Sequence, residues 1–177
     1  MRLDIALTGK MIMEAYLNER RTSSGHVGTH IDLKGKTFDD CTLKAIVFKV
    51  PDDTVIADID LSEVKEGYFV MFNTGHIDKY LYGTKEYGSN HSILSDELIE
   101  RLIERKIRLI GIDGPGIKKG PEHPLTDTYL SERDIFVVEN LCNLDKLEEG
   151  YIYDISIKAK TIQSDGMPVK IEVNDIL

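Results

Sequence analysis

The chain has 177 residues, about the size of one ordinary domain and too short for two of full size. Hydrophobic residues make up 41% and charged residues 30%, a balance that suits a packed core and argues against intrinsic disorder. Asp and Glu number 31 against 22 Lys and Arg, so the formal charge is −9. Nucleic acids and anionic membranes bind basic surfaces, and neither is expected as a partner.

Neither a disulfide framework nor a targeting segment is expected from the sequence. The two cysteines, Cys41 and Cys142, lie far apart and outside any C-x-x-C pattern, which also argues against a cysteine-only zinc site. Residues 1–16 carry charges throughout, unlike a signal peptide. The longest apolar run, residues 68–72, is far shorter than the roughly 20 residues of a membrane span. We therefore expect a cytoplasmic protein.

The first half of the chain predicts strands followed by one clear helix. Runs of β-branched and aromatic residues, bounded by turn residues such as Pro51 and Gly67, predict the strands. These strands are residues 3–7, 43–50, 55–59 and 68–72. The helix is expected over residues 95–106, with Ser95 as its N-cap and an apolar stripe facing a core.

The second half alternates strands with a short helix. An apolar strand at 107–113 runs into a Gly-Pro-Gly turn, and a helix at 129–133 leads into a strand at 135–138 that ends at Glu139. Residues 151–158 and 169–173 are again expected to be extended. Strands outnumber helices, and the pattern predicts one mixed α/β domain over residues 1–177.

The segment around His26 and His30 carries the clearest chemistry. Gly28 and the β-branched residues between and after the histidines disfavour a helix, so a glycine turn into a short strand is expected. On a strand, His30 and Asp32 point to the same face, and the turn brings His26 back towards them. Two imidazoles and a carboxylate suit zinc, manganese or iron(II) and leave coordination positions open for water. The alternative is two surface histidines beside an aspartate at a strand end.

Residues 26–32, His-x-Gly-Thr-His-x-Asp, resemble the signature of the metal-dependent cyclase family, which includes bacterial formamidases and isatin hydrolases. Further segments follow in the order of that family: Asn73-Thr74-Gly75, Tyr87 before Leu94-Ser95, residues 110–115, and residues 138–144. The resemblance implies a swivelling β/β/α fold with a metal site, often binuclear and filled with zinc or manganese. It also implies that His26, His30, Asp32 and Glu139 bind the metal.

The same resemblance draws attention to two departures after the first motif. The family usually has a proline two residues after the aspartate and an acid/base histidine four residues after it; here these positions hold Lys34 and Lys36. A lysine has a pKa of about 10.4 in water and is a poor base at neutral pH unless its environment lowers that value. We interpret Lys34 as part of a solvated turn, whereas Lys36 is either solvated or a substitute proton carrier.

The third departure concerns a second ligand histidine, which the family places twelve residues before the late glutamate. That position is Asp127, which could be a carboxylate ligand of a second metal or the N-cap of a short helix. His123, expected in a rigid loop, could replace the missing acid/base or lie exposed. His76 is a pocket candidate, His91 is expected at the surface, and Asp113 is expected to have a structural role.

Together these observations predict a metal-dependent hydrolase that cleaves an amide-like C–N bond, N-formyl or cyclic, in a small molecule. One or two divalent ions per chain, zinc or manganese, would activate water. His123 or Lys36 would deliver the proton to the leaving nitrogen. The alternative is a homologue that binds metal and ligand without hydrolysis, which the replacements at Lys36 and Asp127 favour. The resemblance further suggests a homo-oligomer.

Overall fold

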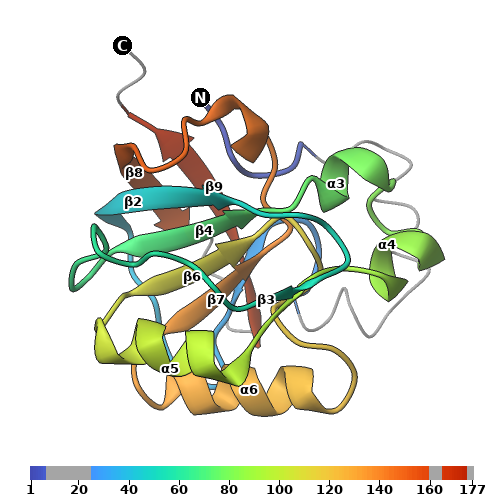
Figure 1. Cartoon of the computed structure of the whole chain (residues 1–177), viewed down its shortest axis with the longest axis horizontal. Coiled ribbons are helices and arrows are strands. Elements are labelled where there is room, and N and C mark those ends of the chain that lie inside the picture. The colour runs from blue at the N-terminus through green and yellow to red at the C-terminus, as the bar shows by residue number, and fades with distance from the viewer. Residues whose placement is uncertain (7–24, 160–164, 175–177) are drawn as a thin grey trace.

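A computed structural model describes residues 1–6, 25–159 and 165–174, which form a mixed α/β fold around a closed barrel (Figure 1). The strand order is β1-β7-β6-β4-β2-β8-β9. The bounds of these strands are β1 His30–Asp32, β2 Cys41–Lys49, β4 Phe69–Asn73, β6 Leu109–Ile112, β7 Phe136–Glu139, β8 Ile152–Ala159 and β9 Gly166–Val173. A separate parallel pair consists of β3 (Val55–Ile56) and β5 (Ile93–Leu94).

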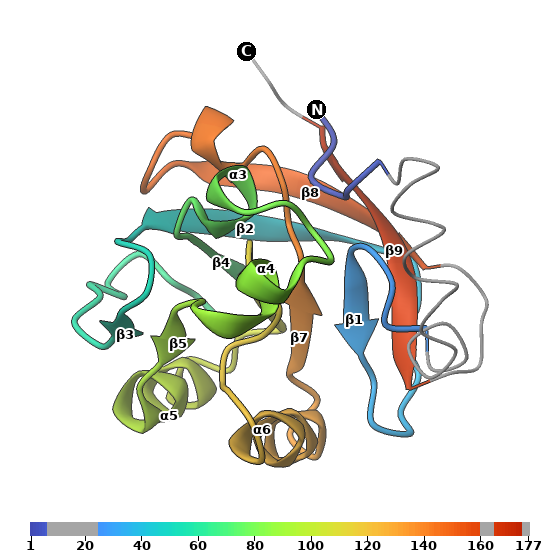
Figure 2. The same ribbon diagram turned by 90° about the vertical axis from the view of Figure 1, so that its right-hand side faces the viewer.

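Helices cover one side of the barrel, where α5 and α6 lie together in Figures 1 and 2. The helices are α3 His76–Lys79, α4 Lys85–Ser89, α5 Asp96–Glu104 and α6 Glu122–Ser131, with a 3₁₀ turn, η1, at Leu144–Lys146. The predicted cap is confirmed, because the Ser95 side chain accepts a hydrogen bond from the backbone N–H of Leu98. None of the helices within the described ranges has the length and apolar character required to cross a bilayer.

Two hydrophobic cores explain why the central strands are apolar along their whole length. Successive side chains of a strand point to opposite faces. In β4, Phe69 and Met71 fill the barrel interior, whereas Val70 and Phe72 pack beneath α5 and α6. All four side chains are therefore fully buried. The barrel packs so closely at Gly111 that a Cβ atom there would lie 2.6 Å from the Phe69 ring.

The structure changes three expected elements. Residues 1–6 make only isolated bridges, at Arg2 and Asp4, where a strand was predicted. The strand predicted at 55–59 is shortened to β3. The helix predicted at 129–133 is the end of α6, which begins at Glu122 because a proline in the first turn, Pro124, does not interrupt a helix.

The sheet topology brings the ends of several strands to one edge. β2, β4, β6 and β7 run parallel, so their carboxyl ends meet there. β1 runs antiparallel to β7, with His30 opposite Glu139, and closes the barrel by also pairing with β9 (Figure 2). The start of β1 thus lies at the edge where β7 ends, which places residues more than a hundred positions apart in one site.

Candidate metal centre

The predicted turn into a short strand is present at residues 25–32. Gly25 and Gly28 have positive φ angles of 79° and 68°, and β1 follows directly. The turn folds His26 back, so that its Nε2 lies 2.9 Å from Oδ1 of Asp32 and its ring centroid lies 4.9 Å from that of His30. Each of these three side chains offers an atom within 4.8 Å of the other two. The sequence prediction that they meet is confirmed in space.

Hydrogen bonds fix which nitrogen of His30 is available. Its Nδ1–H donates to the carbonyl of Gly28 over 2.9 Å, leaving Nε2 as the unprotonated atom of the neutral ring. The same carbonyl accepts from Nδ2 of Asn140, whose Oδ1 accepts from the hydroxyl of Tyr87. Nε2 of His30 then faces Asp32 at 3.6 Å and Glu139 at 3.4 Å. This orientation is the one that metal-binding histidines adopt.

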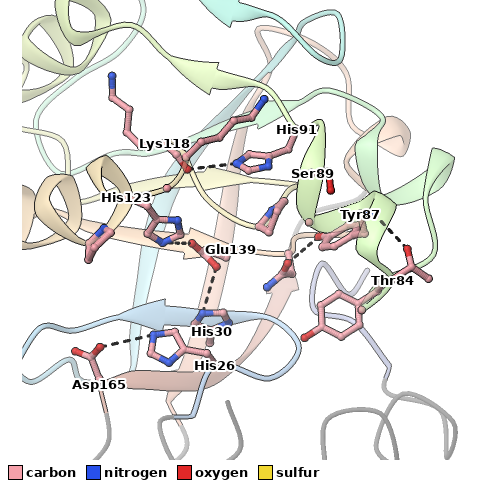
Figure 3. Close-up of a pocket in the computed structure, with 18 of the residues that line it drawn as sticks. His26, His30, Thr84, Tyr87, Ser89, His91, Lys118, His123, Glu139 and Asp165 are labelled. Atoms are coloured by element: carbon pink, nitrogen blue, oxygen red, sulfur yellow. Dashed lines mark hydrogen bonds and ion pairs between the residues drawn. The ribbon is translucent and has the colours of Figure 1, made fainter. Parts of the chain in front are cut away.

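The far side of the site is built by β7 and α6. Oε1 of Glu139 lies 3.0 Å from Nε2 of His123 (Figure 3). The same nitrogen lies 3.2 Å from Oδ2 of Asp127. His123 and Asp127 are four residues apart on α6 and so project from one face of the helix. His123 therefore lies in a helix and not in a loop. Asp127, 3% exposed in the middle of α6, is not an N-cap, and that interpretation was wrong.

Five buried polar atoms in this cluster lack a hydrogen-bond partner among the described residues. They are Nε2 of His30, Oδ1 and Oδ2 of Asp32, Oδ2 of Asp127 and Oε1 of Glu139. Unpaired buried polar atoms are costly, and most proteins avoid them. Oδ1 of Asp32, Oδ2 of Asp127 and Oε1 of Glu139 each lie 2.9–3.2 Å from an imidazole nitrogen of His26 or His123, so the cluster gathers oxygen and nitrogen ligands as a metal centre does. The mixed imidazole and carboxylate donors fit zinc or manganese.

Asp32 belongs to both groups of described side chains whose geometry would allow them to hold a metal ion. The first comprises Asp32 with His26 and His30, and the second comprises Asp32 with His123 and Asp127. Its side chain is fully buried and contributes an oxygen to each group. A carboxylate in that place could bridge two ions, so the donor set alone allows one ion or two.

The charges in the cluster shift several pKa values. Burial alone would lower the pKa of His123, but the carboxylates of Asp127 and Glu139 raise it to about 11. Burial raises the pKa of Asp127 to about 6. The neighbouring Asp32 carboxylate raises the pKa of His26. In the metal-free protein, His26 and His123 therefore keep their protons to higher pH than an ordinary imidazole, and these protons offset part of the negative charge of the cluster.

A tight turn decides which of the two lysines after Asp32 reaches the site. Lys34 and Gly35 both have positive φ, 48° and 79°, and the N–H of Lys36 donates to the carbonyl of Leu33, which defines a type I′ turn. Lys34, expected in a solvated turn, reaches Asp165 at 3.1 Å and Asp127 at 3.9 Å.

Lys36 points away from this cluster. Its side chain is 46% exposed and lies 3.9 Å from Asp134. Proline, fixed near φ −65°, could not adopt the φ of 48° found at Lys34, so this turn would not accept a proline at that position. The position of Lys36 does not support the role of proton carrier considered for it.

The remaining histidines and Asp113 are buried. His91 is 4% exposed, and the expectation of a surface residue was wrong; it lines the pocket and its Nε2–H donates to the carbonyl of Lys118. His76 does not line the pocket, since Asp52 and the Tyr87 carbonyl occupy its two nitrogens. Asp113 accepts hydrogen bonds from Thr74 and Gly75, which joins the ends of β6 and β4.

A cavity of about 900 Å³ opens onto the cluster, which is large enough for a small molecule. His26, His30, His123 and Glu139 line one side, and Tyr82, Tyr87 and His91 line another (Figure 3). Gly116 keeps the approach open: a Cβ atom there would lie 2.5 Å from the His123 ring and 2.9 Å from Glu139. Several pocket residues escaped sequence reasoning, Tyr82 and Asp165 among them, because no local motif marks them.

Comparison with known proteins finds similar proteins that are named as a formamidase, an isatin hydrolase and a metal-dependent hydrolase. Kynurenine formamidase of Bordetella avium (strain 197N) is 30% identical over 106 residues, which is 56% of this chain but only 50% of that protein. Isatin hydrolase A from Ralstonia solanacearum has a TM-score of 0.63 at 19% identity, covering 82% of this chain and 70% of that one. A "predicted metal-dependent hydrolase" from Bacillus stearothermophilus has a TM-score of 0.62 at 23% identity, covering 84% and 76%.

At these identities the solved structures establish a shared fold. The family model described as "Putative cyclase" matches residues 3–119, which contain the whole first motif but end before Asp127 and Glu139. The match spans well over half of the chain, and the barrel agrees with those of the family's solved members. The chain belongs to the cyclase family.

Proposed function

We propose that this protein is a metal-dependent hydrolase that cleaves an amide-like C–N bond, N-formyl or cyclic, in a small molecule. The observation that carries the proposal is a cluster of buried imidazole and carboxylate atoms at the edge of a cavity, five of them without a hydrogen-bond partner among the described residues. The named activities of the relatives, a formamidase and an isatin hydrolase, support the reaction class. The chain spans half the length of that formamidase.

His26, His30 and Asp32 would hold the ion, with Glu139 completing its ligands. A bound divalent ion supplies Lewis acidity and lowers the pKa of a coordinated water towards about 7. The hydrogen bond from Nδ1 of His30 to the Gly28 carbonyl already sets the tautomer in which Nε2 can bind the ion. Asn140 and Tyr87 keep that carbonyl in place and thereby orient the ring.

His123 is the side chain placed to move a proton. Its ring lies on the cavity wall between Asp127 and Glu139, which hold it by charge. Hydrolysis of a C–N bond needs a proton on the departing nitrogen, and an imidazolium on the wall can donate it from Nε2. The family's usual acid/base histidine is replaced by Lys36, which faces solvent, so His123 takes that part in this chain.

One observation favours a second candidate, a homologue that binds metal and ligand without hydrolysis. The position that carries the acid/base histidine in relatives of this family holds Lys36, and that side chain lies outside the cavity. If His123 does not substitute for it, the centre would bind small molecules but leave them intact.

Turnover separates these candidates. The zinc- and manganese-loaded protein should hydrolyse at least one member of a panel containing N-formyl-kynurenine, isatin, lactams and lactones. Treatment with a chelator should remove the activity, and returning the metal should restore it. Full activity in a metal-free preparation would contradict the proposal, and ligand binding without turnover across the panel would favour the second candidate.

Metal uptake should release protons and should strengthen as the pH rises. In the metal-free protein the Asp32 carboxylate raises the pKa of His26, so this ring carries a proton at pH values where an ordinary imidazole has lost it. The ion competes with that proton, so affinity is lowest at acid pH and increases through neutrality. Calorimetric titration in buffers of different ionisation enthalpy measures the protons released. A proton count of zero at pH 6 would contradict the assignment of His26 as a ligand.

A further inference from the structure

We propose that the Lys34 ammonium occupies the place of a second divalent ion, so that this centre takes one ion where its donor atoms would suit two. The inference rests on the proposed metal binding at His26, His30 and Asp32. It assigns to Lys34 a positioning role. The side chain takes no part in the reaction, but its fixed positive charge lies on the Asp127 side of the cluster, where a second ion would otherwise bind.

The distances place Lys34 at the second group of donors. Its Nζ lies 3.9 Å from Oδ2 of Asp127, the same oxygen that lies 3.2 Å from Nε2 of His123. That oxygen is buried and has no hydrogen-bond partner within the described ranges. Because metal–oxygen bonds are about 2 Å long, an ion bound to this oxygen would lie within roughly 6 Å of the ammonium. At such a distance, in a half-buried site, two cations repel strongly.

Lys34 is held in this place by its neighbours. Its side chain is 15% exposed, and Nζ donates to Oδ2 of Asp165 over 3.1 Å. The backbone N–H of Leu33 donates to the carbonyl of Asp165, which ties the two segments together. The type I′ turn aims Lys34 at the cluster and Lys36 away from it. An ammonium fixed in this way cannot leave the cluster without breaking these contacts.

The balance of charge agrees with one ion. Four carboxylates surround the cluster and Lys34: those of Asp32, Asp127, Glu139 and Asp165. With the imidazoles counted as neutral, one dication together with the ammonium neutralises three of these four charges. Two dications together with the ammonium would exceed all four, which is unfavourable in a site where three of the carboxylates are buried.

Lys34→Asn tests the proposal with little disturbance of the turn, since asparagine tolerates a positive φ and Asn-Gly favours type I′ turns. Lys36→Asn is the matched control two residues away, on an exposed side chain. Each protein is titrated with Mn²⁺ or Zn²⁺ alone, and bound metal per chain is measured by elemental analysis and calorimetry. Lys34→Arg keeps the charge and serves as the rescue.

We expect one ion per chain for the wild type, Lys36→Asn and Lys34→Arg, and two for Lys34→Asn. The second dissociation constant should tighten at least about a hundredfold in Lys34→Asn. Two ions in the wild type, or one in a Lys34→Asn protein that melts like the wild type, would overturn the inference and leave the proposed function standing. If no variant binds metal, the proposed function fails and the inference fails with it.

Discussion

Replacing His30 with alanine should remove metal and activity together. Nε2 of His30 is one of the five cluster atoms without a hydrogen-bond partner in the described part of the chain, and the side chain is 2% exposed between Asp32 and Glu139. Without it, the ion loses a ligand whose orientation the protein has already set, and affinity should fall by more than about a hundredfold. Elemental analysis after gel filtration, together with turnover of the substrate found in the panel, measures both losses in one preparation.

His91→Ala is the matched control for this prediction. His91 is also a buried histidine of the cavity wall, but its Nε2–H donates to the Lys118 carbonyl and it belongs to neither group of candidate metal ligands. This variant should retain its metal. Thermal unfolding of the metal-free proteins verifies that both variants fold. A His30→Ala protein that folds and keeps a stoichiometric ion would show that His30 is not a ligand.

His123→Gln should leave the metal in place and slow the reaction. Glutamine keeps a donor near Asp127 and Glu139 but cannot carry the proton that the leaving nitrogen needs. General acid catalysis contributes about 10²- to 10⁴-fold, so kcat should fall by this factor while KM changes little. The Asp127 and Glu139 carboxylates raise the pKa of His123 above that of an ordinary imidazole, and the limb of the pH profile that reports this acid should disappear in the variant.

The metal content of His123→Gln decides between two roles of the same ring. A slow enzyme with one ion per chain supports His123 as the proton carrier. If the ion is lost in proportion to the activity, His123 is instead a ligand, in line with its place in the group with Asp32 and Asp127. Steady-state kinetics alone does not separate these outcomes, so both measurements are needed.

Local sequence signals were sufficient for the first half of the centre. Gly28 favours a turn, and the two-residue period of a strand places His30 and Asp32 on one face, as found. The cap at Ser95 and the apolar run of β4 were equally local, and both elements formed close to the predicted residues. Each depends on neighbours within a few positions of the chain.

The second half of the centre, at His123 and Asp127, depends on tertiary contacts that local sequence signals do not report. Two prolines around His123 suggested a loop, although a proline in the first turn of a helix is well tolerated, and α6 starts before it. That single difference converts Asp127 from a helix cap into a buried group one turn beyond His123. His91 appeared polar and exposed for a similar reason, since its burial comes from the packing of loops distant in sequence.

The turn at Lys34 and Gly35 shows a third kind of limit. Composition predicts a turn there, but the sign of φ at Lys34 decides which lysine meets the carboxylates. The partner Asp165 reaches the site from the segment just before β9, 131 positions away in the sequence. Only the closed barrel brings the two segments together, and no spacing in the sequence records that contact.

The three residues of β1 connect barrel closure to the chemistry of the cluster. This strand joins β7 to β9, and both of its ends carry candidate ligands, His30 opposite Glu139 and Asp32 opposite Val137. Any opening that separates β1 from β7 pulls the two sets of donor atoms apart. An ion that binds only the closed arrangement stabilises that arrangement in proportion to its free concentration. A bound metal would therefore stabilise the closed barrel. The free metal concentration would set the fraction of molecules in which β1, the shortest strand of that barrel, stays paired with β7.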